Sequence, residues 1–280
     1  MNRKSIYFEC YSGISGDMAV AALLDLGVDE AVIRNALEQL ELPGYEIKIG
    51  RISKNGIDAC HFDVQIPRQP HYDEGHGFHF ENPDPHDHEH GHENHSHSHN
   101  PHDHGHGGHT HRNLQDITTI LNKLEDSSVR ELSLNIFECI ASAEAKAHNK
   151  PIEEIHFHEV GAIDSIVDVV SFAACFTSLS VDRVYFSPLY EGYGHVHCQH
   201  GIIPVPAPAT LHILSHSPLH LHLTDAEGEM ITPTGAAFAS VISSGLPVPK
   251  QFRIQKIGMG GGKKQFSRAN ILRVMVIDED

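Results

Sequence analysis

A histidine-rich tract constrains the fold of this chain more than any other feature. From position 71 to position 111, 15 of 41 residues are histidine, mixed with eight acidic residues, Gly, Asn, Ser and Pro. Its only sizeable apolar side chains are Tyr72, Phe78 and Phe80, too few to offset the entropy lost on ordering the backbone. We therefore predict that residues 67–111 form a disordered, metal-binding insertion in an otherwise folded protein.

The side chains of the tract favour divalent transition metals. Neutral imidazole is the commonest side-chain metal ligand, and its affinity rises toward nickel and copper. A purification tag is normally a plain histidine run at a terminus, whereas these histidines are internal. A solvated spacer that buffers any available metal remains an alternative. The predicted tract ligands are His86, His88, His90, His92, His95, His97, His99, His102, His104, His106, His109 and His111.

Charge and cysteine usage exclude several kinds of partner. The net charge is −17, and nucleic-acid binding requires a basic surface. No apolar run reaches the roughly 20 residues that a membrane span needs. The five cysteines are scattered without a CxxC pair, which favours a reducing compartment. We expect a cytoplasmic homo-oligomer that binds neither nucleic acid nor a membrane.

Hydrophobic periodicity predicts alternating strands and helices on both sides of the tract. We expect strands at 5–10, 45–52, 59–66, 184–187, 193–197 and 219–223, and helices at 18–26, 29–40, 114–124, 129–143, 162–179 and from 232. Such alternation is typical of an α/β fold, with a layered sheet and flanking helices. We assign 1–66 and 112–256 to one α/β domain, and 257–280 to a glycine-rich joint and a strand that lead to an absent C-terminal domain.

Two turns precede predicted helices and carry small or hydroxyl side chains. Free amides and the helix dipole at such positions favour anions such as phosphate. Helix capping by Asp17, Thr232 or Thr234 explains the same residues without a ligand. The candidate binding residues in the two turns are Gly13, Ser15, Gly16, Asp17, Thr232 and Thr234.

A second group of residues suits a transition metal or acid–base chemistry. In an extended segment, His156 and His158 point to the same side, and Glu159 follows them. Asp164 and Asp168 then share one helix face at a spacing of four residues. Imidazoles with nearby carboxylates are suitable metal ligands, although a dipole-complementing Asp164 and solvent-exposed histidines explain the pattern equally well.

Taken together, five ordered motifs resemble the LarC family of nickel insertion proteins. The motifs are Ser12–Met18, the histidine tract, His156–Asp164, His200-Gly201 with Pro204–Thr210, and Glu229 with Thr232–Ala237. The resemblance implies insertion of Ni(II) into pyridinium-3,5-bisthiocarboxylic acid mononucleotide, which completes the nickel-pincer cofactor of lactate racemase. It also implies CTP hydrolysis, a C-terminal part of the family protein that binds CTP and Mg or Mn, and lactate racemase apoprotein as a partner.

Carried over motif by motif, the resemblance implies roles for particular residues. It implies a metal-ligand role for His200 and places Asp17 and Thr234 near the substrate phosphate. The implied catalytic residues are His156, His158, Glu159, Asp164 and Glu229. Two other functions stay open from the residues alone. One is a non-enzymatic nickel store or metallochaperone that acts through the tract, and the other is a metal-dependent hydrolase that uses residues 156–168.

Overall fold

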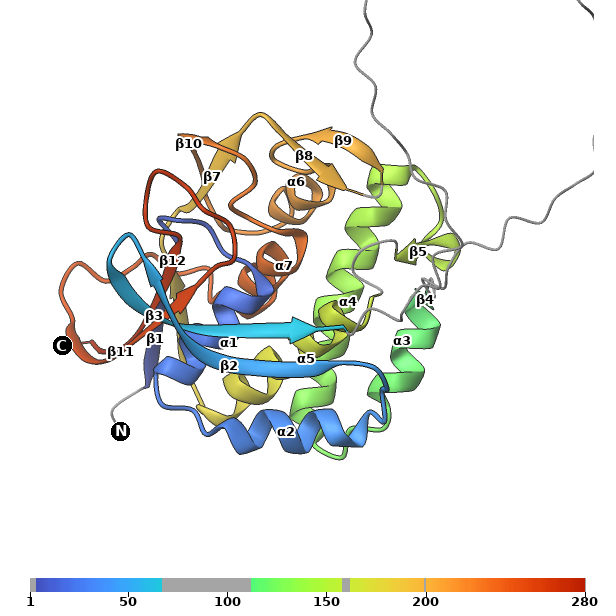
Figure 1. Ribbon diagram of the computed structural model, residues 1–280, viewed down its shortest axis with the longest axis horizontal. Coiled ribbons are helices and arrows are strands. Elements are labelled where there is room, and N and C mark those ends of the chain that lie inside the picture. The colour runs from blue at the N-terminus through green and yellow to red at the C-terminus, as the bar shows by residue number, and fades with distance from the viewer. Residues whose placement is uncertain (1–3, 67–111, 158–161, 199, 280) are drawn as a thin grey trace, which may run out of the picture. The chain divides into compact units, whose positions relative to one another are not determined.

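The computed structural model describes residues 4–66, 112–157, 162–198 and 200–279, which Figure 1 draws as a coloured ribbon. The described residues before and after the tract belong to one compact unit. The predicted insertion at 67–111, with its metal ligands His86 to His111, lies outside the described residues. His158 and Glu159 also lie outside them, and for His156 only the backbone is described.

The described residues form twelve strands, seven α-helices and one short 3-10 helix, η1 (Ile152–Glu154). The strands are β1 (Ser5–Glu9), β2 (Glu46–Lys54), β3 (Ile57–Gln65), β4 (Arg112–Asn113), β5 (His156–Phe157), β6 (Arg183–Phe186), β7 (Leu189–Tyr193), β8 (His195–Cys198), β9 (Gly201–Pro204), β10 (Leu221–Glu227), β11 (Arg253–Gly261) and β12 (Ile271–Asp278). The helices are α1 (Gly16–Asp25), α2 (Glu30–Gln39), α3 (Leu114–Leu121), α4 (Ser127–His148), α5 (Ile163–Ser178), α6 (Pro208–Leu214) and α7 (Pro233–Ile242).

Six strands build one mixed sheet in the order β2–β3–β11–β12–β1–β6. β1 runs parallel to β6 and antiparallel to β12. Because successive side chains of a strand point to opposite faces, Ile6 and Phe8 of β1 enter the main core, while Tyr7 packs with Tyr185 on the other face. The fold is mixed α/β, which confirms the fold class expected from the sequence at this level.

The helices pack in successive layers against one face of this sheet. α1 contacts β3, β11 and β12, α5 contacts α1 and α2, and α4 contacts α5, α6 and α7; Figure 1 shows α1 beside the β2–β3 hairpin. The rings of Phe172 on α5 and Phe238 on α7 stack with centroids 4.0 Å apart, and both are fully buried. Burial of one such side chain contributes roughly 1.5–3 kcal/mol. The core therefore holds α1, α5 and α7 in fixed relative positions.

The glycine-rich segment expected to be a joint is a strand of the central sheet. Residues 253–261 form β11, which pairs antiparallel with β12 along its length. A Cβ atom added to Gly258 would lie 2.6 Å from the Leu26 amide nitrogen, and one added to Gly260 would lie 2.7 Å from that of Ala22. These glycines are thus needed because the backbone of α1 rests directly on β11. Local sequence alone indicated flexibility instead.

Two other expectations differ from the structure. The strand expected at 193–197 is interrupted at Gly194, where φ is +93° and β7 ends before β8 begins. In the segment where a strand was expected at 219–223, Leu alternates with His, yet Leu221 and Leu223 do not face the core and are exposed at 37% and 62%. β10 pairs only with β7 in a two-stranded sheet, so these two leucines lie outside the main core.

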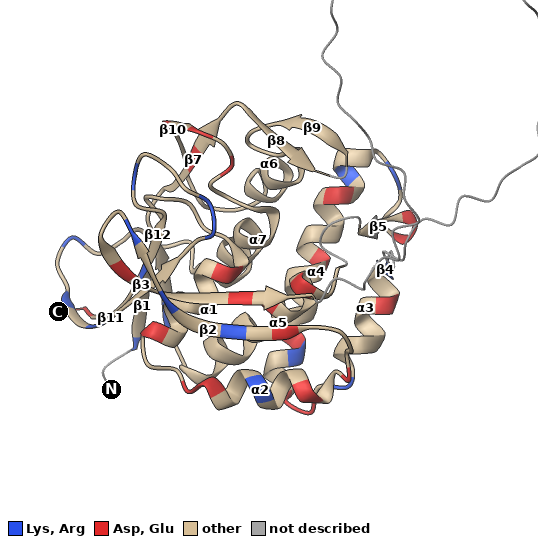
Figure 2. Ribbon diagram, viewed as in Figure 1, with Lys and Arg blue, Asp and Glu red and all other residues tan. Residues whose placement is uncertain are grey.

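Charged residues are spread over the surface elements. Figure 2 shows acidic segments on α2, α3 and α4, and a basic segment between the acidic ones of α2; the net charge of the chain is −17. Within the described ranges, no helix is both long and apolar enough to cross a membrane.

Candidate functional site

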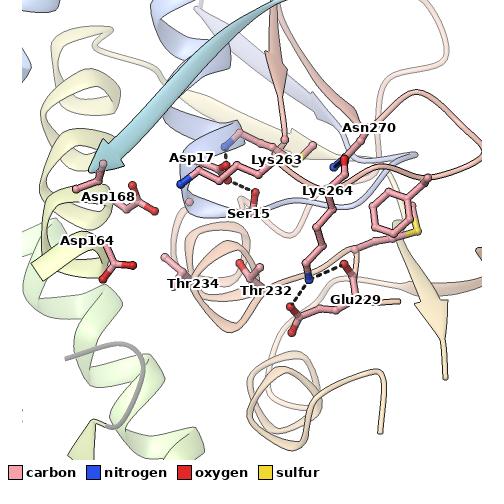
Figure 3. A pocket seen from close by; sticks show the side chains of 16 residues that line it. Ser15, Asp17, Asp164, Asp168, Glu229, Thr232, Thr234, Lys263, Lys264 and Asn270 are labelled. Carbon is pink, nitrogen blue, oxygen red and sulfur yellow. Dashed lines mark hydrogen bonds and ion pairs between the residues drawn. The ribbon is translucent and has the colours of Figure 1, made fainter. Parts of the chain in front are cut away.

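A pocket of about 230 Å³ lies where the N-termini of α1 and α7 meet α5 and the β11–β12 loop. We call it the carboxylate–lysine pocket. Figure 3 shows Asp164 and Asp168 on one side, Asp17 and Lys263 in the centre, and Lys264 with Glu229 on the other side. Its lining residues are Ser15, Gly16, Asp17, Met18, Val64, Asp164, Asp168, Glu229, Met230, Thr232, Thr234, Gly262, Lys263, Lys264, Phe266 and Asn270.

Backbone hydrogen bonds hold the two helix N-termini together. The Ile14 amide donates to the Met230 carbonyl at 3.1 Å, and the Thr232 amide donates to the Ile14 carbonyl at 3.1 Å. A Cβ atom on Gly235 would lie 2.6 Å from the Ile14 carbonyl carbon, so only glycine allows this approach. Two helix dipoles therefore direct their positive ends toward one pocket, which favours a bound anion.

The two helix starts are capped differently. Thr232 Oγ1 accepts a hydrogen bond from the Gly235 amide at 3.1 Å, which confirms Thr232 as a cap. Ser15 is the N-cap residue of α1, but its hydroxyl does not cap the helix; it donates to Asp17 instead. Asp17 lies in the first turn of α1 and accepts from the Met18 amide at 2.9 Å. Its carboxylate remains at the pocket wall.

Three carboxylates, those of Asp17, Asp164 and Asp168, lie near one another in the pocket. Asp168 lies so close to α1 that a Cβ on Gly16 would be 2.5 Å from its Oδ2. Burial, followed by the negative charges of Asp17 and Asp164, raises the pKa of Asp168 well above its ordinary value. A carboxyl group with a raised pKa beside a cavity is suited to proton transfer near neutral pH.

Two lysines of the β11–β12 loop also line the pocket. Lys263 Nζ lies 2.6 Å from Asp63 Oδ1. Burial lowers the pKa of Lys263, but its hydrogen bond to Asp63 and the charges of Asp17 and Asp168 outweigh burial and raise it. Lys264 Nζ lies 2.9 Å from Glu229 Oε2. The lysines bring positive charge to a pocket that would otherwise repel anions.

Comparison with known proteins identifies the family of this chain. Residues 6–280 match the family model described as "nickel insertion protein". The chain belongs to this family. It is 49% identical over 277 residues to the pyridinium-3,5-bisthiocarboxylic acid mononucleotide nickel insertion protein of Alkaliphilus metalliredigens, which covers 98% of this chain and 61% of the relative. The LarC resemblance that the motifs indicated is thereby confirmed.

Two further members of the nickel insertion protein family carry the same name. The Clostridium acetobutylicum protein is 43% identical over 98% of this chain and 64% of its own length. The Acetivibrio thermocellus protein is 38% identical over 97% of this chain and 60% of its own length. The chain thus spans about three fifths of the length of these curated relatives. No solved structure matches it significantly.

The structure gathers seven of the nine predicted site residues whose side chains it describes. Ser15, Gly16, Asp17, Asp164, Glu229, Thr232 and Thr234 all line the carboxylate–lysine pocket. Gly13 does not line it; Gly13 belongs to the turn before α1, where a Cβ would lie 2.5 Å from the Met230 carbonyl carbon. His200 lies at a second cavity that shares Glu229 and Lys264 with the pocket. Among the described residues, no group of three His, Cys, Asp or Glu side chains is arranged to hold a metal ion.

Four residues with polar or charged side chains line the pocket but were not among the predicted site residues: Asp168, Lys263, Lys264 and Asn270. The sequence did indicate Asp168, because its spacing of four residues from Asp164 placed both on the same helix face. The lysines follow the glycine run that was interpreted as a joint. Asn270 Nδ2 donates to the Lys264 carbonyl at 3.0 Å; no sequence pattern indicated this contact.

Glu191 positions the loop that carries Glu229. Its side chain is fully buried, and its Oε1 accepts hydrogen bonds from the amides of Gly192, Met230 and Ile231 at 2.8, 2.6 and 3.2 Å. Burial raises the pKa of Glu191 to about 7, although the three amide donors oppose it. Glu191 therefore binds a proton in the folded state at pH values where it is ionised in the unfolded chain.

This difference predicts a pH-dependent stability that Glu191→Gln removes. The contribution of Glu191 is fully present below the unfolded pKa and is lost as pH rises through about 7. A shift of this size corresponds to on the order of 3 kcal/mol. Urea denaturation at pH 5 and pH 8 should show the free energy of unfolding falling more in the wild type than in Glu191→Gln. Glu38→Gln, an exposed change on α2, should match the wild type; parallel pH profiles for all three proteins would contradict the prediction.

Proposed function

We propose that this chain acts in the insertion of Ni(II) into pyridinium-3,5-bisthiocarboxylic acid mononucleotide, which completes the nickel-pincer cofactor of lactate racemase. Membership of the nickel insertion protein family and the printed names of its relatives support this function. The observation that carries it is the carboxylate–lysine pocket, because one cavity combines anion-binding groups with acid–base groups.

The two ends of the pocket suit the two ends of this substrate. The mononucleotide phosphate would lie at the N-termini of α1 and α7, near Thr232, Thr234 and Lys264, where amides and an ammonium group favour negative charge. The pyridinium ring would then extend toward α5. There its positive charge meets the carboxylates of Asp17, Asp164 and Asp168, which favour a cation.

Asp168 is the residue we assign as general base. Formation of the nickel–carbon bond requires loss of the proton from the ring carbon that is metallated. In this step the C–H bond breaks, its electron pair forms the bond to Ni(II), and the proton moves to the Asp168 carboxylate. Nickel keeps its oxidation state, and the two thiocarboxylates supply sulfur ligands. A raised pKa, as for Asp168, makes a carboxylate a more effective base near neutral pH.

The CTP requirement belongs to this proposal as well. We assign CTP and Mg or Mn binding to the portion of the relatives that this chain does not span.

We place the reaction in the cytoplasm. The five cysteines, all within the described ranges, form no disulfide with one another, and a reducing compartment keeps cysteines in this state.

A maturation assay tests the proposed function. The full chain would be incubated with the bisthiocarboxylated mononucleotide, Ni(II), CTP and Mg²⁺, together with the remaining portion of the Alkaliphilus relative. Mass spectrometry should detect a product that has gained nickel and lost protons. Absence of this product, with an intact relative active in the same mixture, would overturn the proposal.

Deletion of residues 70–111 separates insertion from nickel storage. If chemistry resides in the carboxylate–lysine pocket, the deleted protein should form product at the wild-type rate when free nickel is in excess. If the chain only stores nickel in the tract, the deletion should abolish its effect on product formation at every nickel concentration. The second result would contradict the proposed function.

A further inference from the structure

A second cavity, of about 380 Å³, adjoins the carboxylate–lysine pocket and shares Glu229 and Lys264 with it. Its walls come from the C-terminal end of α4, the β8–β9 hairpin and the start of α6. We call it the histidine–cysteine cavity, because His148, His197, Cys198 and His200 line it. No step of the proposed insertion reaction uses this cavity.

Two soft or borderline donors lie close together in the β8–β9 hairpin. Cys198 Sγ lies 3.8 Å from His200 Nδ1. Two ligands on one tetrahedral ion, with a metal–sulfur bond of about 2.3 Å and a metal–nitrogen bond of about 2.0–2.1 Å, lie about 3.6 Å apart. The observed separation is therefore close to that of a pair sharing one ion. A hydrogen bond between the Cys198 thiol and the His200 imidazole accounts for the same distance. Titration with a metal ion distinguishes a hydrogen-bonded pair from a metal-binding pair.

A second imidazole and a carboxylate stand beside this pair. The rings of His148 and His200 lie with centroids 4.8 Å apart at an interplanar angle of 42°. His148 is the last residue of α4, and its Nε2 lies 3.5 Å from Glu144 Oε2. A carboxylate that holds the ring of a neighbouring histidine is the usual support of a metal-ligating imidazole. Two segments that are distant in the sequence, α4 and the hairpin, thus supply the donors.

We propose that Cys198 and His200 bind a divalent transition metal ion of the nickel–zinc class, with His148 as the neighbouring imidazole. Binding removes the thiol proton of Cys198 to solvent and changes no oxidation state. A thiolate and an imidazole select such ions over Mg²⁺ or Ca²⁺, which prefer oxygen ligands.

The position of the proposed ion suits its transfer to the substrate. The shared wall of Glu229 and Lys264 places the histidine–cysteine cavity next to the carboxylate–lysine pocket. Resting on the proposed function, the ion held in this cavity is the Ni(II) that is then passed to the thiocarboxylate sulfurs of the substrate.

Thiolate absorption tests this site in the full chain. The histidine tract contains no cysteine, so a thiolate-to-metal charge-transfer band on titration with Ni(II) or Co(II) reports on a cysteine site alone. We expect the band in the wild type and in Cys139→Ser, a half-buried cysteine of α4. Cys198→Ser should lose it, and His200→Ala should weaken the metal binding that the band follows by about 10-fold or more. Circular dichroism of each variant checks that it is folded.

Two results would overturn the site: no charge-transfer band at saturating metal, or a band that persists unchanged in Cys198→Ser. The titration needs no substrate, so it is independent of the insertion assay. A charge-transfer band that requires Cys198, in a protein that forms no nickel product, would support the metal site and contradict the proposed function. If product forms normally at limiting nickel but the charge-transfer band is absent, the proposed function is supported and the metal site is contradicted.

Discussion

Asp168→Asn is expected to lower the rate of nickel insertion by about 10²- to 10⁴-fold, the usual contribution of a positioned general base. Asparagine has nearly the same shape but cannot accept the ring proton. The folded protein already favours the neutral form of this side chain, because burial and the charges of Asp17 and Asp164 raise the pKa of Asp168. The substitution should therefore leave the free energy of unfolding unchanged or increase it at pH 8. Single-turnover product formation at saturating substrate measures the effect.

Asp164→Asn is the matched control for this variant. Asp164 lies one helical turn earlier on α5 and lines the same pocket, but its side chain is exposed. We expect a rate within about 10-fold of the wild type, because Asp164 contributes charge but accepts no proton. The wild-type rate should rise with pH as Asp168 loses its proton, and this rise should be absent from the residual activity of Asp168→Asn. If Asp168→Asn inserts nickel at the wild-type rate, Asp168 is not the general base.

Gly13→Ala is expected to lower the free energy of unfolding by roughly 2–5 kcal/mol, because two costs add at this position. The backbone φ of Gly13 is +80°, a conformation that costs an L-residue roughly 1–2 kcal/mol. The new Cβ would also lie 2.5 Å from the Met230 carbonyl carbon, and overpacking of a fixed neighbour costs about 1–3 kcal/mol or more. Urea denaturation of the variant and the wild type measures the loss.

Gly44→Ala separates the two costs. Gly44 has a φ of +82°, yet nothing lies within 4 Å of its added Cβ. This variant carries only the backbone cost, and we expect a loss of about 1–2 kcal/mol in the same denaturation experiment. Insertion activity should fall only in Gly13→Ala, because Gly13 lies beside the Ile14–Met230 hydrogen bond. Equal destabilisation of both variants would show that the contact with Met230 has no cost.

Much of the carboxylate–lysine pocket was predictable, because short sequence motifs predict where helices begin. Thr232 was expected to cap a helix, and it does so through the Gly235 amide. The turn at Ser15–Asp17 was expected before a helix, and α1 begins at Gly16. Asp17 was expected to be the cap, but Ser15 holds that position. The capping residues are local features, so spacing along the chain is sufficient to find them.

The lysines and the histidine–cysteine cavity depend on contacts between distant segments. Lys263 meets Asp63 and Lys264 meets Glu229, and neither pairing follows from a local pattern. The same holds for His148 beside His200, since α4 and the β8–β9 hairpin adjoin only in the folded protein. The family resemblance pointed to His200 but gave no indication of which donors would surround it.

The sequence by itself determined the alternation of strands and helices, the two anion-favouring helix starts and the polar histidine tract, because periodicity, capping and composition act over a few residues. Only the tertiary structure decided that those helix starts meet in one pocket, that Asp168 faces this pocket, and that the glycines of β11 support α1. These features arise from close packing between residues as far apart as Met18 and Gly260, and such packing has no signature in the neighbouring sequence of either residue.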